Sequence, residues 1–234
     1  MRIRVATLGG SLLRPEVEDR HEWLIGLCKA VNDVISSGYK LSLVIGGGAP
    51  AREGIQLARP ILNTNTEALD RIGIAATRLN ATIVAEALIE NGNDVSHLIP
   101  TNIQDAVEYS KNHDIVVMGG TEPGHTTDTV AIQLAKELGA ECCIIATNVG
   151  YVYSSDPRIN EDADKFETMT HEELSEIVGP AEHQNAGRSG VIDPIGASIA
   201  KDAQLNLAVL DGRDIERLRA ALNGESFEGT NVEG

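Results

Sequence analysis

Short, almost continuously apolar segments alternate along the chain with longer segments whose apolar residues recur at helical spacing. The apolar segments have the length of β-strands and cover residues 3–8, 40–45, 115–118, 142–147 and 206–210. The segments with helical spacing cover residues 21–37, 51–59, 67–90, 103–111, 128–138, 170–178, 194–202 and 215–222. Strands that are apolar on both faces are typical of parallel sheets covered by helices on each side. The pattern therefore predicts an α/β fold with a mostly parallel central sheet.

Helix starts and one long polar segment add detail to this prediction. Thr170 with Glu173 has the pattern of a capping box, and Asp193-Pro194 supplies an N-cap followed by proline at the first helical position. Residues 151–169 are polar and rich in turn formers, and a loop of this length is usually functional or folds as a small hairpin. Residues 224–234 form a candidate closing strand. With no linker or repeat in the sequence, we expect a single domain over residues 1–234.

Composition and charge narrow the class of protein. Hydrophobic residues make up 42% of the 234 positions and charged residues 23%, which is typical of a folded globular chain. No apolar run approaches the roughly 18 residues that span a bilayer, and no signal-peptide core follows the first residues, so we expect a cytoplasmic protein with no membrane partner. A net charge of −16 argues against nucleic acid as a partner. The three cysteines lack metal-binding spacing, and their odd number argues against a disulfide framework.

Three glycine clusters carry the main functional signal, because each directly follows a predicted strand. They are Gly9-Gly10-Ser11, Gly46-Gly47-Gly48 and the segment 119–124, which begins Gly119-Gly120 and ends at Gly124. Glycine lets backbone N–H groups approach a ligand closely, and the N-terminus of a helix attracts anions. Ligands of open α/β sheets bind at the carboxyl ends of the strands. The clusters together predict a site for an extended, phosphate-rich ligand.

Two common phosphate-binding motifs fit only in part. Gly46-x-Gly48-x-x-Ala51 matches the dinucleotide pattern, but Asp70, at about the distance expected for the ribose-binding acid, falls within a predicted helix and not at a strand end. The segment 119–126 has Walker A spacing with His125 where the motif requires lysine. We therefore expect a phosphate cradle outside the P-loop class, with His125, Thr126 and Thr127 as possible donors to phosphate oxygens.

Charged side chains add a second group of candidates. Arg52 lies in the first turn of the helix after Gly48, where its guanidinium group is placed to reach a bound phosphate. Arg78 follows Asp70 by eight residues on one predicted helix, so both can lie on the same face. Asp156, followed by proline, lies in the polar loop near a strand end and is a candidate ligand-binding residue.

Six motifs run in order along nearly the whole chain. They are GGS at 9–11, GGG-x-x-AR at 46–52, DRIGIAATRLNA at 70–81, GGTEPGHTTDTVA at 119–131, TNVGYVYSSDP at 147–157 and VIDPIGASI at 191–199. In this order they resemble the amino acid kinase superfamily and, within it, the archaeal branch of the uridylate (UMP) kinases. The resemblance implies a three-layer α/β/α sandwich and transfer of the ATP γ-phosphoryl group to UMP, giving UDP and ADP in pyrimidine nucleotide biosynthesis. It also implies Mg²⁺ as cofactor and a homohexamer.

The resemblance further implies roles for individual residues, with an acceptor-binding half over about 1–139 and an ATP-binding half over 140–234. The ATP phosphates are expected at Gly9, Gly10, Gly48 and Arg52. UMP is expected at Gly47, Asp70, Thr121, Glu122, Pro123, Gly124, His125, Thr126 and Thr127. The adenosine of ATP is expected at Thr147, Asn148, Tyr153 and Asp156. No residue is assigned to the metal ion.

The chain departs from the superfamily at two charged positions. The lysine that many members carry just before the first Gly-Gly is missing, as it is in the archaeal branch, because residues 6–9 read Ala-Thr-Leu-Gly. The usual N-V-D-G reads Asn-Val-Gly-Tyr at 148–151, so an acidic group near the nucleotide is missing. Arg52 and Arg188 are the candidate catalytic cations. These departures leave open a non-catalytic oxyanion-storage or nucleotide-sensing protein, or a sister kinase for another small phosphate or carboxylate acceptor.

Overall fold

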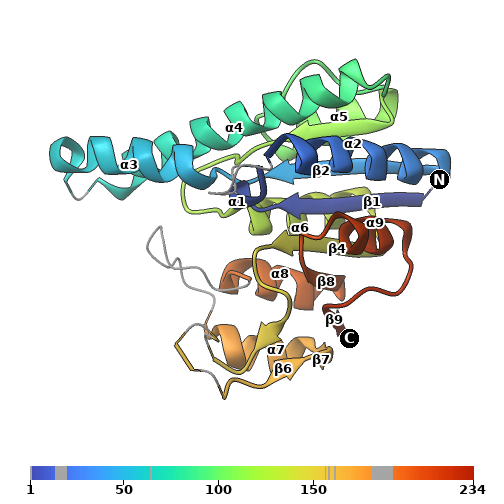
Figure 1. Cartoon of the computed structure of the whole chain (residues 1–234). Coiled ribbons are helices and arrows are strands. Elements are labelled where there is room, and N and C mark those ends of the chain that lie inside the picture. The colour runs from blue at the N-terminus through green and yellow to red at the C-terminus, as the bar shows by residue number, and fades with distance from the viewer. Residues whose placement is uncertain are drawn as a thin grey trace.

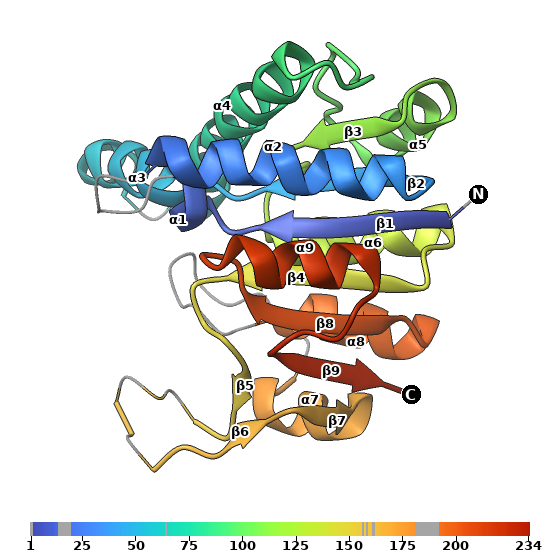
Figure 2. The ribbon, with the colours of Figure 1, turned by 45° about the vertical axis from the view of Figure 1, so that its right-hand side comes forward.

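A seven-stranded sheet runs through the middle of the protein, with helices on both faces (Figures 1 and 2). The computed structural model describes residues 2–13, 20–63, 65–155, 157, 159–160, 162–180 and 192–234. The strand order is β3 (Ile115–Met118), β2 (Tyr39–Ile45), β1 (Arg2–Leu8), β4 (Cys142–Thr147), β8 (Asn206–Asp211), β9 (Thr230–Glu233) and β7 (Thr168–Thr170). All neighbours are parallel except β8 and β9. The predicted three-layer α/β/α fold with a mostly parallel sheet is confirmed.

The helices divide between the two faces of the sheet. One face is covered by α1 (Gly10–Leu13), α2 (Arg20–Ser36), α4 (Thr66–Glu90) and α9 (Ile215–Asn223). The other is covered by α5 (Ile103–Asn112), α6 (Thr127–Leu138), α7 (His171–Val178) and α8 (Pro194–Ala203). Side chains of successive strand residues enter opposite cores: in β3, Ile115 and Val117 join the first core, whereas Val116 and Met118 join the second. This alternation explains why the strands are apolar at nearly every position.

Several local predictions are confirmed. Thr170 and Glu173 form a reciprocal capping box at the start of α7, and Asp193 caps α8 ahead of Pro194. The polar segment after β4 contains a small antiparallel hairpin, β5 (Val152–Tyr153) with β6 (Lys165–Phe166), and β9 is the closing strand expected in the C-terminal tail. The hairpin extends the chain beyond the carboxyl end of β4, where a ligand site is expected.

Helices α3 (Gly48–Leu62) and α4 pack against each other, and α3 extends beyond the sheet (Figure 1). α3 has no buried residue and continues through Pro60, past the predicted end at residue 59. By length and composition alone, α4 could cross a membrane, contrary to the expectation that no stretch of the chain is long and apolar enough. The core helix of a soluble protein passes the same test, and α4 buries Leu69, Val84 and Leu88, so this is weak evidence for a membrane span.

Candidate active site

The glycine turns after β1 and β2 pack backbone against backbone at the carboxyl edge of the sheet. The nitrogen of Gly46 donates a hydrogen bond to the carbonyl oxygen of Leu8 (2.8 Å). A Cβ atom at Gly10 would lie 2.2 Å from the nitrogen of Gly48 and 2.5 Å from the oxygen of Gly46. Gly48 itself has a φ of +58°, which favours glycine. The first two glycine clusters therefore form one continuous backbone surface.

The same edge brings the first glycine turn beside the ends of β4 and β8. Gly9 donates through its nitrogen to the oxygen of Ala146 (2.9 Å), and Gly212 donates to the oxygen of Thr147 (2.8 Å). Thr147 is paired with Asp211 in the sheet register. A residue predicted to hold ATP phosphates thus lies next to one predicted to hold the adenosine.

The N-terminus of α3 has the chemistry of an anion site. Its N-cap, Gly47, provides no side-chain hydrogen bond to the first turn, so the N–H groups of that turn are not capped by a side chain. Arg52 is exposed on the first turns of the same helix and makes no hydrogen bond or ion pair within the residues described above. The structure therefore places Gly47, Gly48 and Arg52 together.

Asn80 of α4 holds the second glycine turn in place. This fully buried side chain donates through Nδ2 to the carbonyl oxygens of Gly46 (2.8 Å) and Gly47 (3.0 Å). It lies within one of the motifs that carry the family resemblance, but sequence reasoning did not single it out. Its role depends on a contact between a helix and a turn more than 30 positions away, which residue spacing alone does not reveal.

The third glycine turn, after β3, rests on the middle of α4. The nitrogen of Gly120 donates to Oγ1 of Thr77 (2.7 Å), and a Cβ atom at Gly119 would lie 2.5 Å from the same oxygen. Arg78 donates to the backbone oxygens of Gly120 (3.2 Å) and Thr121 (3.1 Å). Arg78 therefore braces the backbone of the turn, a structural role that its predicted position near the ligand did not anticipate.

Asp70 and the segment 121–127, which were predicted to share a ligand, do lie together. The nitrogen of Gly124 donates to Oδ2 of Asp70 at 3.0 Å. His125 lies in the same segment, with Nδ1 3.3 Å from Oε1 of Glu122. A carboxylate, backbone N–H groups and an imidazole are thereby gathered from α4 and from the loop before α6.

The hydroxyl of Thr126 already has partners in this structure. Thr126 caps α6 by accepting from the nitrogen of Thr129 (3.1 Å), and it donates to the carboxylate of Asp193. Thr129 also donates to Asp193, at 2.8 Å and 2.9 Å to its two oxygens. Asp193 thus joins the start of α6 to the start of α8. Donation from Thr126 to a phosphate stays a prediction. In this structure its hydroxyl has a structural role, because it joins α6 to Asp193.

Asp128, in the first turn of α6, is a titratable group that sequence reasoning missed. Its Oδ1 accepts a hydrogen bond from the hydroxyl of Thr7 on β1 (3.2 Å). Burial, and then the negative charge of Asp193, raise the pKa of Asp128 to about 7, while the bond from Thr7 acts in the opposite direction. A carboxyl group that titrates near neutral pH therefore lies against Thr7, which is two positions before Gly9 in the chain.

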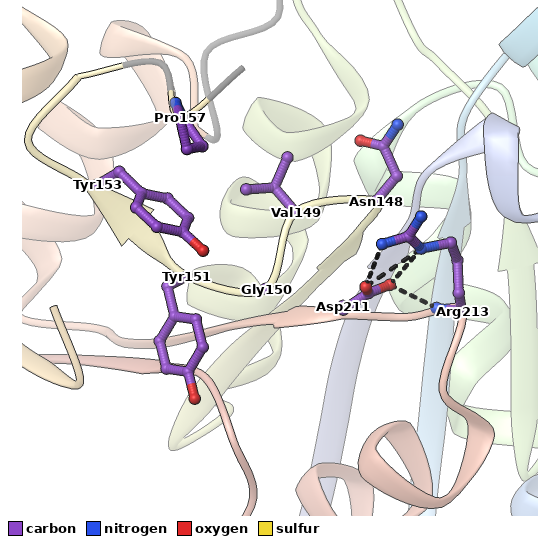
Figure 3. Close-up of a pocket in the computed structure, with 8 residues that line it drawn as sticks. All are labelled: Asn148, Val149, Gly150, Tyr151, Tyr153, Pro157, Asp211 and Arg213. Atoms are coloured by element: carbon purple, nitrogen blue, oxygen red, sulfur yellow. Dashed lines mark hydrogen bonds and ion pairs between the residues drawn. The ribbon is translucent and has the colours of Figure 1, made fainter. Parts of the chain in front are cut away.

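A hollow of about 320 Å³ opens beyond β4 and β8 (Figure 3). It is lined by Asn148, Val149, Gly150, Tyr151, Tyr153, Pro157, Asp211 and Arg213. Asn148 and Tyr153 were predicted to hold adenosine. Asp156 and Arg188 lie outside the described residues. Asp211 and Arg213 were missed, although an acidic residue and a glycine directly after a predicted strand give the same signal that located the other turns.

Comparison with known proteins places this geometry in a family. The model of the amino acid kinase family matches residues 2–211. The chain belongs to the amino acid kinase family, as the motifs indicated.

Within that family, its relatives include the uridylate kinases. The enzyme of Methanococcus maripaludis strain C5 is 40% identical over 228 residues, which cover 97% of this chain and 98% of the relative. The uridylate kinase of Methanocaldococcus jannaschii is 38% identical, covering 98% of this chain and all of its own (100%). The crystal structure of uridylate kinase from Archaeoglobus fulgidus has a TM-score of 0.84 and 37% identity, covering 99% of this chain and 100% of that one. The resemblance drawn from the sequence is confirmed.

Proposed function

We propose that this protein is a uridylate kinase, which transfers the γ-phosphoryl group of ATP to UMP and gives UDP and ADP. The observation that carries the proposal is the similarity to archaeal uridylate kinases over nearly the whole chain, at 40% identity and 97% coverage. The site supports it, because glycine turns from separate strands meet at one edge of the sheet, where two phosphate-bearing ligands can face each other.

ATP is assigned to the edge formed by β1, β4 and β8. Its phosphates lie over Gly9, Gly10 and Gly48, and its adenosine extends past Thr147 into the hollow that contains Asn148 and Tyr153. The backbone contact between the first two glycine turns supports a continuous run of phosphate groups across them. Asp156, outside the described residues, is assigned to the same pocket. This assignment places the phosphates of ATP over residues of the half 1–139 and the adenosine over residues of the half 140–234.

UMP is assigned to the part of the site built from residues 1–139. Gly47 and Asp70 face it from α3 and α4, and the run 121–127 encloses it from the loop before α6. The hydrogen bond between Gly124 and Asp70 supports this grouping, because it joins two elements assigned to the same ligand. A carboxylate suits the ribose hydroxyls of UMP as an acceptor of charge-assisted hydrogen bonds.

The chemical step asks for positioning and charge neutralisation more than for covalent chemistry. Arg52, exposed and unpaired within the described residues, is assigned to the phosphoryl group in transfer, together with Arg188. Backbone N–H groups add to this positive charge. They come from the start of α3, where no side chain caps them, and from the glycine turns, and they can donate to phosphate oxygens. These groups are oriented before the substrates arrive, so that little reorganisation is needed as charge shifts between oxygens.

Mg²⁺ is assigned to the nucleotide and not to a protein cage. The described part of the chain has no group of three or more His, Cys, Asp or Glu side chains placed to hold a metal ion. Mg²⁺ does not require such a group, because it is typically held by substrate phosphates with one or two carboxylates. When bound, the ion neutralises charge on the phosphate oxygens.

We propose that the protein acts in pyrimidine nucleotide biosynthesis in the cytoplasm as a homo-oligomer, with a hexamer expected from the family resemblance. Four large apolar side chains on α3 and α4 are exposed: Leu57 (81%), Ile61 (85%), Leu79 (52%) and Ile83 (38%). An apolar surface of this kind typically marks an interface. Light scattering of the purified protein coupled to size-exclusion chromatography measures the oligomer directly.

An ADP-release assay with a panel of acceptors tests the activity. The purified chain is given ATP and Mg²⁺ with UMP, CMP, AMP, acetylglutamate or isopentenyl phosphate. We expect rapid ADP release with UMP and much slower release with the other four. Faster turnover of acetylglutamate or isopentenyl phosphate would overturn the proposal in favour of a sister kinase, and no turnover of any acceptor would favour a nucleotide-binding protein.

A further inference from the structure

The hollow beyond β4 and β8 has a polar side and an aromatic side (Figure 3). Asn148, Asp211 and Arg213 lie on the side toward the sheet, whereas Tyr153 and Pro157 lie across from them. A nucleoside that enters with its phosphates over the glycine turns would meet the polar side first. The ribose would therefore lie against the polar side chains and the base against the aromatic side.

Asp211 lies close to the assigned phosphate positions. It is the last residue of β8 and pairs in register with Thr147, the last residue of β4. The Cα atom of Thr147 is 3.7 Å from where a Cβ atom would lie on Gly9. Only β4 therefore separates Asp211 from the first glycine turn, so a nucleotide with its phosphates over that turn can bring its ribose to Asp211.

The carboxylate of Asp211 is held in one orientation. Its side chain is 17% exposed, and its Oδ1 accepts from the backbone nitrogen (3.0 Å) and Nε (2.9 Å) of Arg213, while Oδ2 also accepts from Nε (3.1 Å). Burial acts to raise the pKa of Asp211, but the hydrogen bonds and charge of Arg213 outweigh it, so the net pKa lies below its usual value. The group is therefore ionised at neutral pH and is a strong acceptor.

The glycine at position 150 gives a reason for a carboxylate from β8 to serve in the hollow. The resemblance to N-V-D-G leads to the expectation of an acidic side chain there, and this chain has glycine. A Cβ atom on Gly150 would lie 4.0 Å from Cβ of Asp211 and 3.7 Å from Nη1 of Arg217, with nothing in the way. A carboxyl group at 150 and the one at 211 would therefore enter the same corner of the hollow.

We propose that Asp211 binds the ribose hydroxyls of the donor nucleotide and takes the place of the acidic side chain that is missing at position 150. Arg213 acts as a positioning residue by orienting the carboxylate. The proposal rests on the proposed function, because it requires that the hollow holds ATP. It names a residue that decides preference between ribose and deoxyribose in the donor.

Steady-state kinetics of the full-length protein test the inference with three variants. Asp211→Asn removes the charge with little change in shape. Asp214→Asn is the matched control, since Asp214 caps α9 outside the hollow and asparagine caps helices as well as aspartate. The double variant Gly150→Asp/Asp211→Asn moves the carboxyl group to the other position; Gly150 is not in the left-handed region, so aspartate fits without strain. Each is assayed with ATP, 2′-deoxy-ATP and 3′-deoxy-ATP.

We expect Asp211→Asn to raise KM for ATP at least about tenfold, the loss expected for a hydrogen bond to a charged group, while KM for UMP changes by less than about twofold. The preference for ATP over the deoxy analogues should shrink by a similar factor and return in the double variant, with Asp214→Asn behaving as wild type. Unchanged KM and unchanged ribose preference in Asp211→Asn would overturn the inference. So would equal increases in both KM values with a lowered unfolding temperature, since that result indicates a structural role.

Tyr153→Ala separates failure of the inference from failure of the donor assignment. If the hollow holds ATP, this variant raises KM for ATP and not for UMP, because the aromatic side packs against the base. A selective rise in KM for UMP would overturn both the donor assignment and the inference. A selective rise in KM for ATP, with Asp211→Asn unchanged from wild type, would overturn the inference alone.

Discussion

The hydroxyl of Thr7 on β1 and the carboxylate of Asp128 on α6 form a hydrogen bond of 3.2 Å between residues 121 positions apart in the chain. The bond ties the strand that leads into the first glycine turn to the helix that follows the third. It also leaves a carboxyl group beside Asp193, in surroundings that raise the pKa of Asp128 to about 7. The protein should therefore respond to pH through this residue.

The contribution of Asp128 to stability should fall as the pH rises from about 4 to about 7. In that range the folded protein keeps the Asp128 proton, whereas the unfolded chain, with a pKa of 3.8, releases it. Each pKa unit corresponds to about 1.4 kcal/mol. Asp128→Asn, which cannot ionise, should lose this part of the pH dependence and exceed wild type in stability at pH 8. Urea unfolding at a series of pH values measures the difference, and parallel curves for the two proteins would contradict the prediction.

Asn80→Ala should destabilise the fold and weaken binding of both nucleotides. The substitution leaves the carbonyl oxygens of Gly46 and Gly47 without their buried donor, at a cost of about 1–3 kcal/mol. Asn112→Ala is a suitable control, because Asn112 is exposed and, among the described residues, its side-chain amide makes one long hydrogen bond (3.5 Å), to the backbone oxygen of Glu108. Urea unfolding and separate titrations with ATP and UMP measure the effect. Equal stability of the two variants would show that Asn80 does not hold the turn.

Asp70→Asn should weaken UMP binding far more than ATP binding. A carboxylate that accepts from ribose hydroxyls contributes charge-assisted hydrogen bonds worth about 1.5–3 kcal/mol, and an amide contributes less. The bond from Gly124 can persist, because the asparagine oxygen also accepts. Calorimetric titration of each nucleotide gives the two affinities. Equal losses for ATP and UMP would refute the assignment of Asp70 to the acceptor.

Arg52→Lys should lower turnover at least about tenfold, or roughly 1.4 kcal/mol, with little change in KM for UMP. The guanidinium fork can reach two phosphate oxygens at once, which an ammonium group cannot reproduce. Arg59→Lys is the matched control, because Arg59 is also exposed, lies further along α3, and undergoes the same replacement of guanidinium by ammonium. Near-normal kcat in Arg52→Lys would move the search for the catalytic cation to Arg188.

Much of the fold could be predicted because its determinants are local. Strands buried on both faces read as apolar runs, and the caps at Thr170 and Asp193 are encoded within four residues of the helices they start. Helix ends were less predictable. The helix α3 begins at Gly48 and passes through Pro60, because its length depends on packing against α4 as well as on its own residues.

From the residues alone, the site was easiest to predict where the chemistry follows a strand directly, whereas the role of Asp70, within a helix, came from the family resemblance. Glycine turns meet that condition, and so the three clusters were found. Asn80 and Asp193 act across distances of 33 to 67 positions, and the same residue types at the same spacing would be unremarkable surface groups in another fold. Thr126 shows the reverse case, since a hydroxyl expected to face a ligand has protein partners.

The contact between Gly10 and the turn at Gly46–Gly48 limits how proteins with this sheet can evolve. The atoms that a side chain at Gly10 would strike belong to the main chain, so no second substitution nearby can make room for it. Compensation, the usual route by which a damaging change becomes tolerated, is closed here. Descendants of this chain that acquire a new substrate must therefore keep this junction and vary other parts of the site.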